Sequence, residues 1–282
     1  MTTRTRAEGF LLGATIIWSG TFALVKDALG SISPLLFVGI RFSIAAIVLV
    51  IIFFRSIRNI NRRAFFDGLV LGILLGFGFT TQTVGLQYTM ASKSGFITGM
   101  TVVFTPLFQM VIERRMPRAG NVAGVVLVLI GLWFLTSPKG QTFNFGDALT
   151  LIAAVVFALY MVFLDVFSKR NDILHLTFLQ IAATAFLALV GSVIVENVRL
   201  EPTIGLFGTF LYTVFFATLL TTYLQTRFQR DTTPTRAALI FSLEPVLAAV
   251  ISWWVLGEVI GSQGILGAMF IVIGILGSEL SR

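Results

Sequence analysis

The sequence has no cysteine, a single histidine and little charge. Only 12% of its 282 residues are Asp, Glu, Lys or Arg. The absence of cysteine excludes disulfides and thiol chemistry. His175 has no Cys or His cluster beside it, which favours a residue at a helix boundary over a metal ligand. The chain also lacks a Gly-x-x-x-x-Gly-Lys-Ser/Thr loop, a Gly-x-Ser-x-Gly turn and a His-Glu-x-x-His helix, so no motif indicates ATP drive, a nucleophilic serine or a catalytic zinc.

Long apolar runs dominate the chain instead. Hydrophobic residues make up 56% of it, and 28 residues are Phe. A run of about 18 to 22 apolar residues can cross a lipid bilayer as a helix, and an open strand cannot satisfy its backbone there. The sequence therefore predicts an all-α integral membrane protein with ten spans. They are 9–28, 34–54, 67–88, 92–112, 119–137, 146–166, 173–195, 203–226, 235–256 and 261–279.

The basic residues lie mostly between these spans. With the connections assigned to alternate sides, fifteen Lys and Arg fall on one side and four on the other, and Arg41 completes the 20. The positive-inside rule makes the richer side, with both termini, cytoplasmic. The net charge of +7 is then a topology signal, and nucleic acid is not an expected partner. Nine further runs follow the first, so we interpret it as a retained span and not a secretory signal. The four residues on the poorer side are Lys26, Lys93, Lys139 and Arg199.

Comparison of the chain with itself indicates an internal repeat. The matches keep their order and a near-constant offset, so we divide the chain into halves at 1–137 and 146–282. Each half holds five spans, an odd number, which predicts that the second is inserted in the opposite orientation. Such inverted repeats are common in secondary transporters. The offset of 139 pairs Trp18 with Phe157, Thr21 with Tyr160, Arg41 with Gln180, Ala46 with Ala185 and Pro106 with Pro245, and a later offset of 143 pairs Gly124 with Gly267 and Gly131 with Gly274.

Arg41 and Glu244 are predicted to be the only full charges that hydrocarbon must accommodate, which makes them the first candidates for function. Glu244 follows Pro234 by ten residues, or about 15 Å of helix, and lies near the midplane. It can take up a proton, bind a cation such as a substrate amine, or serve as a structural carboxyl. Arg41 can gate, pair with Glu244, bind a substrate carboxylate or neutralise helix-end carbonyls.

Pro106 and Pro245 lie inside the fourth and ninth predicted spans. A proline inside a helix removes one hydrogen bond and bends the axis. Matched bends could hollow out a cavity between the halves, although neighbouring helices also repair such kinks. We expect these two prolines to kink their helices.

Several segments resemble the EamA family of the drug/metabolite transporter superfamily. In that family the first, third, fourth, sixth, eighth and ninth helices line a central space. The resemblance thereby implies a shared cavity formed by Trp18, Gln82, Thr98, Tyr160, Tyr223 and Glu244, whose aromatic faces suit a cation. The chain departs from the pattern at Glu113-Arg114-Arg115, where Gly-Glu is usual, and at Phe157, where tryptophan is common. The resemblance rests on residues 37–46, 85–88, 94–99, Leu243-Glu244-Pro245-Val246, Gly257-Glu258, Gly267 and Gly274.

The resemblance implies a secondary transporter in a bacterial cytoplasmic membrane that exports amino acids, related metabolites or drugs, although some relatives import. We expect the halves to rock about a central site, with Glu244 as the carrier if protons are coupled. A channel-like facilitator is the alternative, and an intramembrane enzyme or a scaffold subunit explains the sequence less well. No cofactor or metal is expected. The glycine pairs Gly72/Gly76, Gly95/Gly99 and Gly120/Gly124 suit helix packing within one chain, with a homodimer contact as the alternative.

Overall fold

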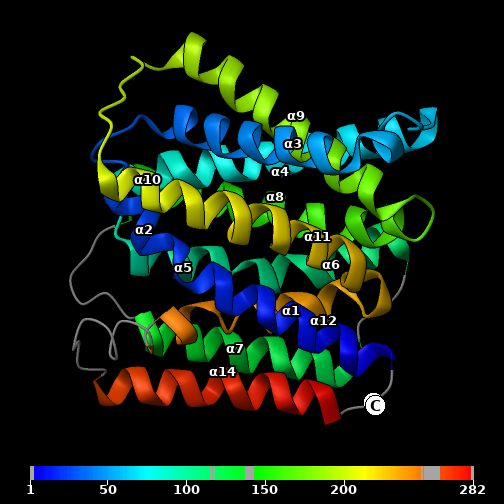
Figure 1. The fold of residues 1–282 in the computed structure, drawn as a ribbon. Helices are drawn as coiled ribbons and strands as arrows, with labels where there is room; N and C mark the ends of the chain where they lie inside the picture. The colour runs from blue at the N-terminus through cyan, green and yellow to red at the C-terminus, as the bar shows by residue number, and fades with distance from the viewer. Residues whose placement is uncertain are drawn as a thin grey trace.

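The structure is a computed structural model that describes residues 3–114, 116, 118–136, 143–248, 250 and 261–280. Within these ranges it is a bundle of helices (Figure 1), with one isolated bridge between Ile32 and Leu200 and no strand. The helices are α1 Thr3–Ser19, α2 Thr21–Ala28, α3 Pro34–Ile57, α4 Arg62–Tyr88, α5 Ala91–Gly99, α6 Thr101–Glu113, α7 Ala119–Thr136, α8 Phe145–Ser168, α9 Ile173–Val195, α10 Ile204–Leu211, η1 Tyr212–Leu220, α11 Thr221–Phe228, η2 Gln229–Asp231, α12 Pro234–Phe241 and α14 Ser262–Leu280.

Seven helical stretches of the described chain are long and apolar enough to cross a membrane. Two further apolar helices, Ala119–Phe134 and Ser262–Ser278, are shorter. The predicted span 235–256 is described only up to residue 248 and at residue 250. These helices support a multi-pass membrane protein. The seven stretches are Thr3–Ala28, Pro34–Ile57, Arg62–Tyr88, Ala91–Glu113, Phe145–Ser168, Ile173–Val195 and Ile204–Asp231.

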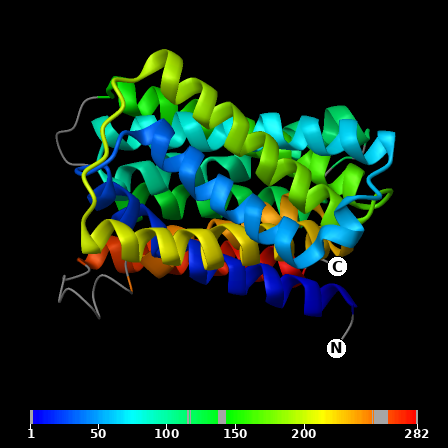
Figure 2. The same ribbon diagram turned by 45° about the horizontal axis from the view of Figure 1, so that its top comes forward.

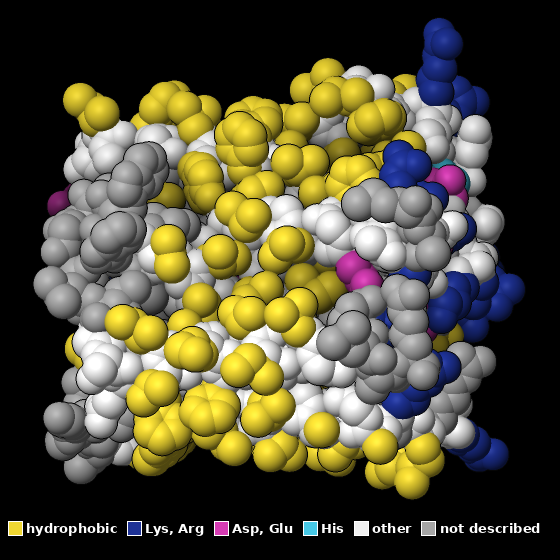
Figure 3. Space-filling model, turned by 90° about the horizontal axis from the view of Figure 1, so that it is seen from below, with side chains coloured by type: hydrophobic (Ala, Val, Ile, Leu, Met, Phe, Trp, Pro, Cys, Tyr) yellow, Lys and Arg dark blue, Asp and Glu magenta, His cyan; other side chains and the backbone are white. Residues whose placement is uncertain are grey.

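The surface separates apolar from basic residues along the bundle. In Figure 3, hydrophobic side chains cover the middle of the visible face and Lys and Arg gather at one end. Figure 2 shows that the start of α1 and the end of α14 lie at that same end of the molecule. The arrangement is what an even number of crossings produces.

Polar side chains fix the starts of the helices. Asn61 accepts from the backbone N–H of Ala64 at 2.8 Å, and Asn144 forms a capping box with Asp147. The first N–H groups of α3 are capped from the other half of the chain. There the Glu196 carboxylate accepts from the N–H groups of Leu35 and Leu36 at 2.9 and 3.3 Å. The negative charge also complements the positive end of the helix dipole.

Besides the turn at Gly20 between α1 and α2, two of the apolar segments are interrupted near their middles. The break between α5 and α6 falls at Met100, and the break after α12 falls at residues 242–243, after which the chain is helical again at 244–248. Pro106 lies inside α6 without interrupting it, and Thr105 donates to the Thr101 carbonyl at 2.7 Å in the preceding turn. Pro245 stands in the first turn of its segment, where a missing N–H costs little. The break at Met100 therefore does not fall at Pro106, whereas the break at residues 242–243 directly precedes Glu244 and Pro245.

The spacing of helix starts corrects the sequence pairing of the prolines. The loop 196–203 is longer than the loop 58–61, and the stretch from α10 to α12 contains η1, a π-helix, whose wider turns take up an extra residue. The number of residues between equivalent positions of the two halves has therefore already reached 143 where α5 and α12 begin. Pro106 and Pro245 are only 139 residues apart, so they do not lie at equal distances from these helix starts. The N-cap pairs are Ser33 and Asp172 (139 apart), Asn61 and Thr203 (142), and Met90 and Thr233 (143).

Helices from the two halves pack directly on each other. The most extensive contacts are between α7 and α14, α3 and α9, α4 and α8, and α4 and α9, and Figure 1 shows α7 beside α14 at one edge. A Cβ on Gly124 would lie 2.7 Å from the Gly274 carbonyl oxygen, and one on Gly131 would lie 2.6 Å from that of Gly267. The two helices are therefore antiparallel and approach backbone to backbone. Gly72 of α4 packs against α9 in the same way, so this glycine face is used within the chain.

Candidate functional site

A cavity lies at the centre of the bundle, between the two halves. The volume of the cavity that is open to the centre of a water molecule is about 110 Å³. This volume has room for several waters or a small metabolite. Most of its wall is apolar or aromatic. Its lining comprises Trp18, Thr21, Phe22, Arg41, Leu75, Phe79, Gln82, Gly95, Thr98, Gly99, Thr101, Phe157, Tyr160, Met161, Gln225, Ala238, Phe241, Ser242, Glu244 and Pro245.

The cavity brings together most of the side chains that the sequence singled out. Trp18, Gln82, Thr98, Tyr160 and Glu244 all line it, as do Arg41 and Pro245. They come from helices α1, α3, α4, α5 and α8 and from the segment after α12.

Tyr223 and Pro106 are not among the lining residues. Tyr223 is 38% exposed on α11, whereas Gln225 of the same helix lines the cavity. Two residues along a helix correspond to a rotation of about 200°, so the two side chains point to opposite faces. The polar residues Thr221, Thr222, Gln225 and Thr226 recur at helical spacing and form the buried face, a signal that could have indicated Gln225. The cavity therefore has Gln225 where Tyr223 was expected.

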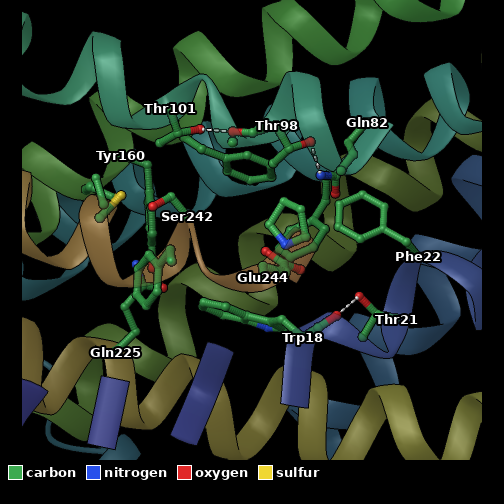
Figure 4. A pocket seen from close by; sticks show the side chains of 18 of the residues that line it. Trp18, Thr21, Phe22, Gln82, Thr98, Thr101, Tyr160, Gln225, Ser242 and Glu244 are labelled. Carbon is green, nitrogen blue, oxygen red and sulfur yellow. Dashed lines mark hydrogen bonds between the residues drawn. The ribbon is translucent and has the colours of Figure 1, made fainter. Parts of the chain in front are cut away.

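The Glu244 carboxylate points into the middle of the cavity. Figure 4 shows it above Trp18 and beside Phe22. The break at residues 242–243 places Glu244 in the first turn of a helical segment, in which Leu247 donates to the Leu243 carbonyl at 2.9 Å. No described residue donates a hydrogen bond to this carboxylate or forms an ion pair with it. It is a carboxyl group that a cationic ligand or a proton could meet.

Arg41 also lines the cavity and is held by groups of η1. Its Nε donates to the hydroxyl of Thr218 at 2.6 Å, and an NH2 group donates to the Ala217 carbonyl at 2.8 Å. The guanidinium also lies 5.4 and 5.2 Å from the ring centroids of Phe42 and Phe79, within cation–π range. In the described part of the chain no ion pair joins Arg41 to Glu244.

Two donors from the first half converge on one carbonyl of the π-helix η1. The Ala217 oxygen accepts from Arg41 and also from the indole nitrogen of Trp18, at 3.2 Å. The indole edge of Trp18 is thus fixed to the π-helix η1 of the second half, and its face is left for the cavity (Figure 4). π-helical turns often occur at functional sites, where they redirect such backbone groups.

The remaining polar side chains in the wall are bonded to one another. Gln82 Nε2 donates to the hydroxyl of Thr98 at 2.9 Å. The Tyr160 hydroxyl donates to Gln180 at 2.7 Å, and Gln180 in turn donates to Thr226. Tyr160 therefore presents its ring to the cavity while its hydroxyl is engaged behind the wall.

Buried charge is more abundant than the sequence analysis predicted. Lys93 and Asp147 form an ion pair at 2.5 Å with side-chain exposures of 9% and 0%. Asp165 pairs with Lys169, and Arg236 pairs with Glu8. Arg41 and Glu244 are therefore not the only buried charges. The others lie near the ends of apolar runs, where sequence reasoning assigned them to water, and the Asn144-x-x-Asp147 capping box was the available signal.

No metal site is formed by the described residues, among which no group of three or more His, Asp and Glu comes together. His175, at the start of α9, has its Nε2 2.9 Å from the Ser56 carbonyl oxygen. This contact joins α3 to α9 at a helix end. Gly257 and Glu258, which contribute to the family resemblance, lie outside the described residues.

Comparisons with known proteins agree with this architecture. The EamA-like transporter family matches residues 5–137 and again residues 144–279. The chain belongs to this family. An uncharacterized transporter of Archaeoglobus fulgidus is 34% identical over 261 residues, which cover 93% of the chain and 82% of the relative. The uncharacterized transporter YoaV of Bacillus subtilis is 27% identical and covers 94% of both proteins.

A third relative carries a named substrate. It is the S-adenosylmethionine/S-adenosylhomocysteine transporter of Chlamydia muridarum, 26% identical over 92% of the chain and 86% of that protein. Among solved structures, one described only as "Crystal structure of protein" superposes with a TM-score of 0.80 at 18% identity, covering 98% of this chain and 97% of the other. At that identity the likeness establishes the shared fold.

Proposed function

We propose that this EamA-family protein is a secondary transporter of small amine-bearing metabolites, working as an exporter across a bacterial cytoplasmic membrane. The observation that carries the proposal is the Glu244 carboxylate, which faces an aromatic-lined cavity and has no partner among the described residues. A cation with an apolar body would complement this wall through its charge and through the faces of Trp18 and Phe22. The named Chlamydia muridarum relative supports the class, because both of its substrates carry an amine.

Alternating access between two inverted halves, 1–137 and 146–282, is the proposed mechanism. Two features support it: the family matches the chain twice, and the glycine contacts between α7 and α14 are reciprocal. Under the offset of 143, Gly124 corresponds to Gly267 and Gly131 to Gly274, so the contact Gly124–Gly274 maps onto Gly267–Gly131. A two-fold axis in the membrane plane has this property and makes the related helices antiparallel.

A ligand screen in detergent tests the substrate class. A molecule that binds the folded state raises its apparent stability. We expect polyamines, quaternary amines or amino acids to raise the melting temperature of the protein, and nucleobases without a cationic group to have no effect. The Glu244→Gln variant should bind the active amine about 10 to 100 times more weakly, because a charged hydrogen bond is worth roughly 1.5–3 kcal/mol.

The matched control is Glu201→Gln, which neutralises an exposed loop carboxylate. This variant should keep the thermal shift of the parent protein. An equal shift in the Glu244→Gln variant would remove Glu244 from recognition. Proteoliposomes then separate the transporter from a channel-like facilitator: saturable uptake with counterflow supports the former, and linear flux without counterflow supports the latter.

A further inference from the structure

Two polar clusters join the halves at opposite ends of the cavity. In the first, which we call the Asp147 lock, the Asp147 carboxylate accepts from the hydroxyl of Thr89 at 2.6 Å and from Lys93 Nζ at 2.5 Å. Thr89 and Lys93 belong to the first half, and Asp147 belongs to the second. Asp147 is fully buried, so this charge depends on its protein partners.

The second cluster, the Glu8 lock, repeats the threonine, the cation and the acid with the halves exchanged, and it adds Arg4 of α1, whose Nε also donates to Glu8 at 3.0 Å. The Glu8 carboxylate of α1 accepts from the hydroxyl of Thr232 at 3.0 Å and from Arg236 NH1 at 3.0 Å. Here the acid lies in the first half and the donors lie in the second. The side chains of Arg236 and Glu8 are 7% and 12% exposed. A threonine hydroxyl and a cation four residues further on thus bind one acid in both clusters.

The repeat relates the two locks residue by residue. Thr89 and Lys93 precede Thr232 and Arg236 by 143 residues, the spacing of the N-caps Met90 and Thr233. Glu8 precedes Asp147 by 139 residues, the spacing that holds in the first two spans of each half. The pair of Asp67 with Arg170, at 2.7 Å, joins the halves without such a counterpart, since the positions 143 residues after Asp67 and 139 residues before Arg170 hold no charged residue. We use this pair below as a control.

Each lock is continuous with the cavity wall. Lys93 lies near the start of α5, which then contributes Gly95, Thr98 and Gly99 to the lining before the break at Met100. Arg236 lies near the start of α12, which contributes Ala238 and Phe241 before its own break. Along both short helices, the first turn therefore contains the lock residue, the following residues line the cavity, and the helix ends at a break. Releasing either lock frees a short segment that already has a hinge.

We propose that the Asp147 lock and the Glu8 lock are the two gates of the transport cycle, one for each side of the membrane. The inference rests on the proposed alternating access and adds the residues that close each side. Both locks are formed in the structure. Opening to one side separates one acid from its threonine and cation and hydrates both, while the other lock holds the halves together. By the distribution of basic residues, the Glu8 lock faces the cytoplasm.

Thiol labelling tests the proposal, and the chain offers a cysteine-free background. A single reporter, Thr21→Cys, places a thiol in the cavity wall. A membrane-impermeant thiol reagent is applied to intact cells for the outer side and to inside-out vesicles for the inner side, without substrate. We expect Asp147→Asn to speed labelling from the outer side at least about tenfold, and Glu8→Gln to do so from the inner side. A factor of ten corresponds to about 1.4 kcal/mol in the gate equilibrium.

Opposite responses of the two variants support the gates, whichever side each lock faces. Equal responses, or unchanged rates in both, overturn the proposal. Because no substrate is present, the result is independent of whether amines bind at Glu244. Thr89→Val and Thr232→Val remove one hydrogen bond each without stranding a charge, so they give the same test with a smaller factor if the charge variants fail to fold.

Arg170→Met is the matched control at the inner end. It breaks the ion pair between Arg170 and Asp67, which belong to different halves. This pair lies at the same end of the bundle as the Glu8 lock, because Ser168, two residues before Arg170, accepts a hydrogen bond from Arg230, two residues before Thr232. Arg170 belongs to neither α5 nor α12, so this variant should leave the labelling rate of Thr21→Cys unchanged from both sides. A rise equal to that of Glu8→Gln would mean that any loss of contact between the halves opens the cavity, and the specific role of the lock would be lost.

Discussion

Arg41 shows at the scale of one residue how a buried charge is accommodated. Its guanidinium has two hydrogen-bond acceptors on η1 and two aromatic faces beside it, a geometry that needs a planar, forked donor. We expect Arg41→Lys to destabilise the protein by roughly 1.5–3 kcal/mol, since the short ammonium cannot reproduce both bonds. The measurement is thermal unfolding in detergent, combined with Thr218→Val in a double-mutant cycle. Strict additivity of the two substitutions would show that the Arg41–Thr218 bond contributes nothing.

The same residue scale shows what sequence could predict of the site. Depth and rarity of charge drew attention to Arg41 and Glu244, and the family resemblance led to Trp18, Gln82, Thr98 and Tyr160; all six line the cavity. The inward face of α11 was missed at Tyr223, although its buried polar residues Thr221, Thr222, Gln225 and Thr226 recur at helical spacing and mark that face. Buried ion pairs were also missed, since an acid near the end of an apolar run looks solvated until its partner is known.

At the scale of the element, helix existence was predictable and helix interruption was not. Apolar runs located the spans, because length and hydrophobicity decide membrane crossing. The break at Met100 and the π-helix η1 carry no comparable signal, whereas the break at residues 242–243 lies just before Pro245. Tertiary contacts compensate the backbone groups at such breaks, so local sequence does not specify them.

The contact between α7 and α14 gives a prediction at this scale. A Cβ on Gly274 would lie 2.8 Å from the Gly124 carbonyl oxygen, whereas one on Gly277 meets nothing within 4 Å. Gly274→Ala should therefore lower stability by about 1–3 kcal/mol through overpacking. Gly277→Ala on the same helix should be neutral or stabilising by up to about 1 kcal/mol, because alanine favours the helix. Melting temperatures of the two variants in one detergent compare them directly. Equal destabilisation would mean that the backbones do not approach as described.

For the whole molecule, the strongest consequence of the proposed inverted repeat is the prediction that equivalent loops lie on opposite sides of the membrane. The loops 58–61 and 196–203 follow α3 and α9, which occupy the same place in their halves. Asn59 and Glu201 are exposed in these loops, and the basic excess places the first on the cytoplasmic side. In the cysteine-free chain, Asn59→Cys should react with an impermeant maleimide only in inside-out vesicles, and Glu201→Cys only in intact cells. Two thiols that react from the same side would make the repeat parallel and leave the two locks on one face, where they could not alternate.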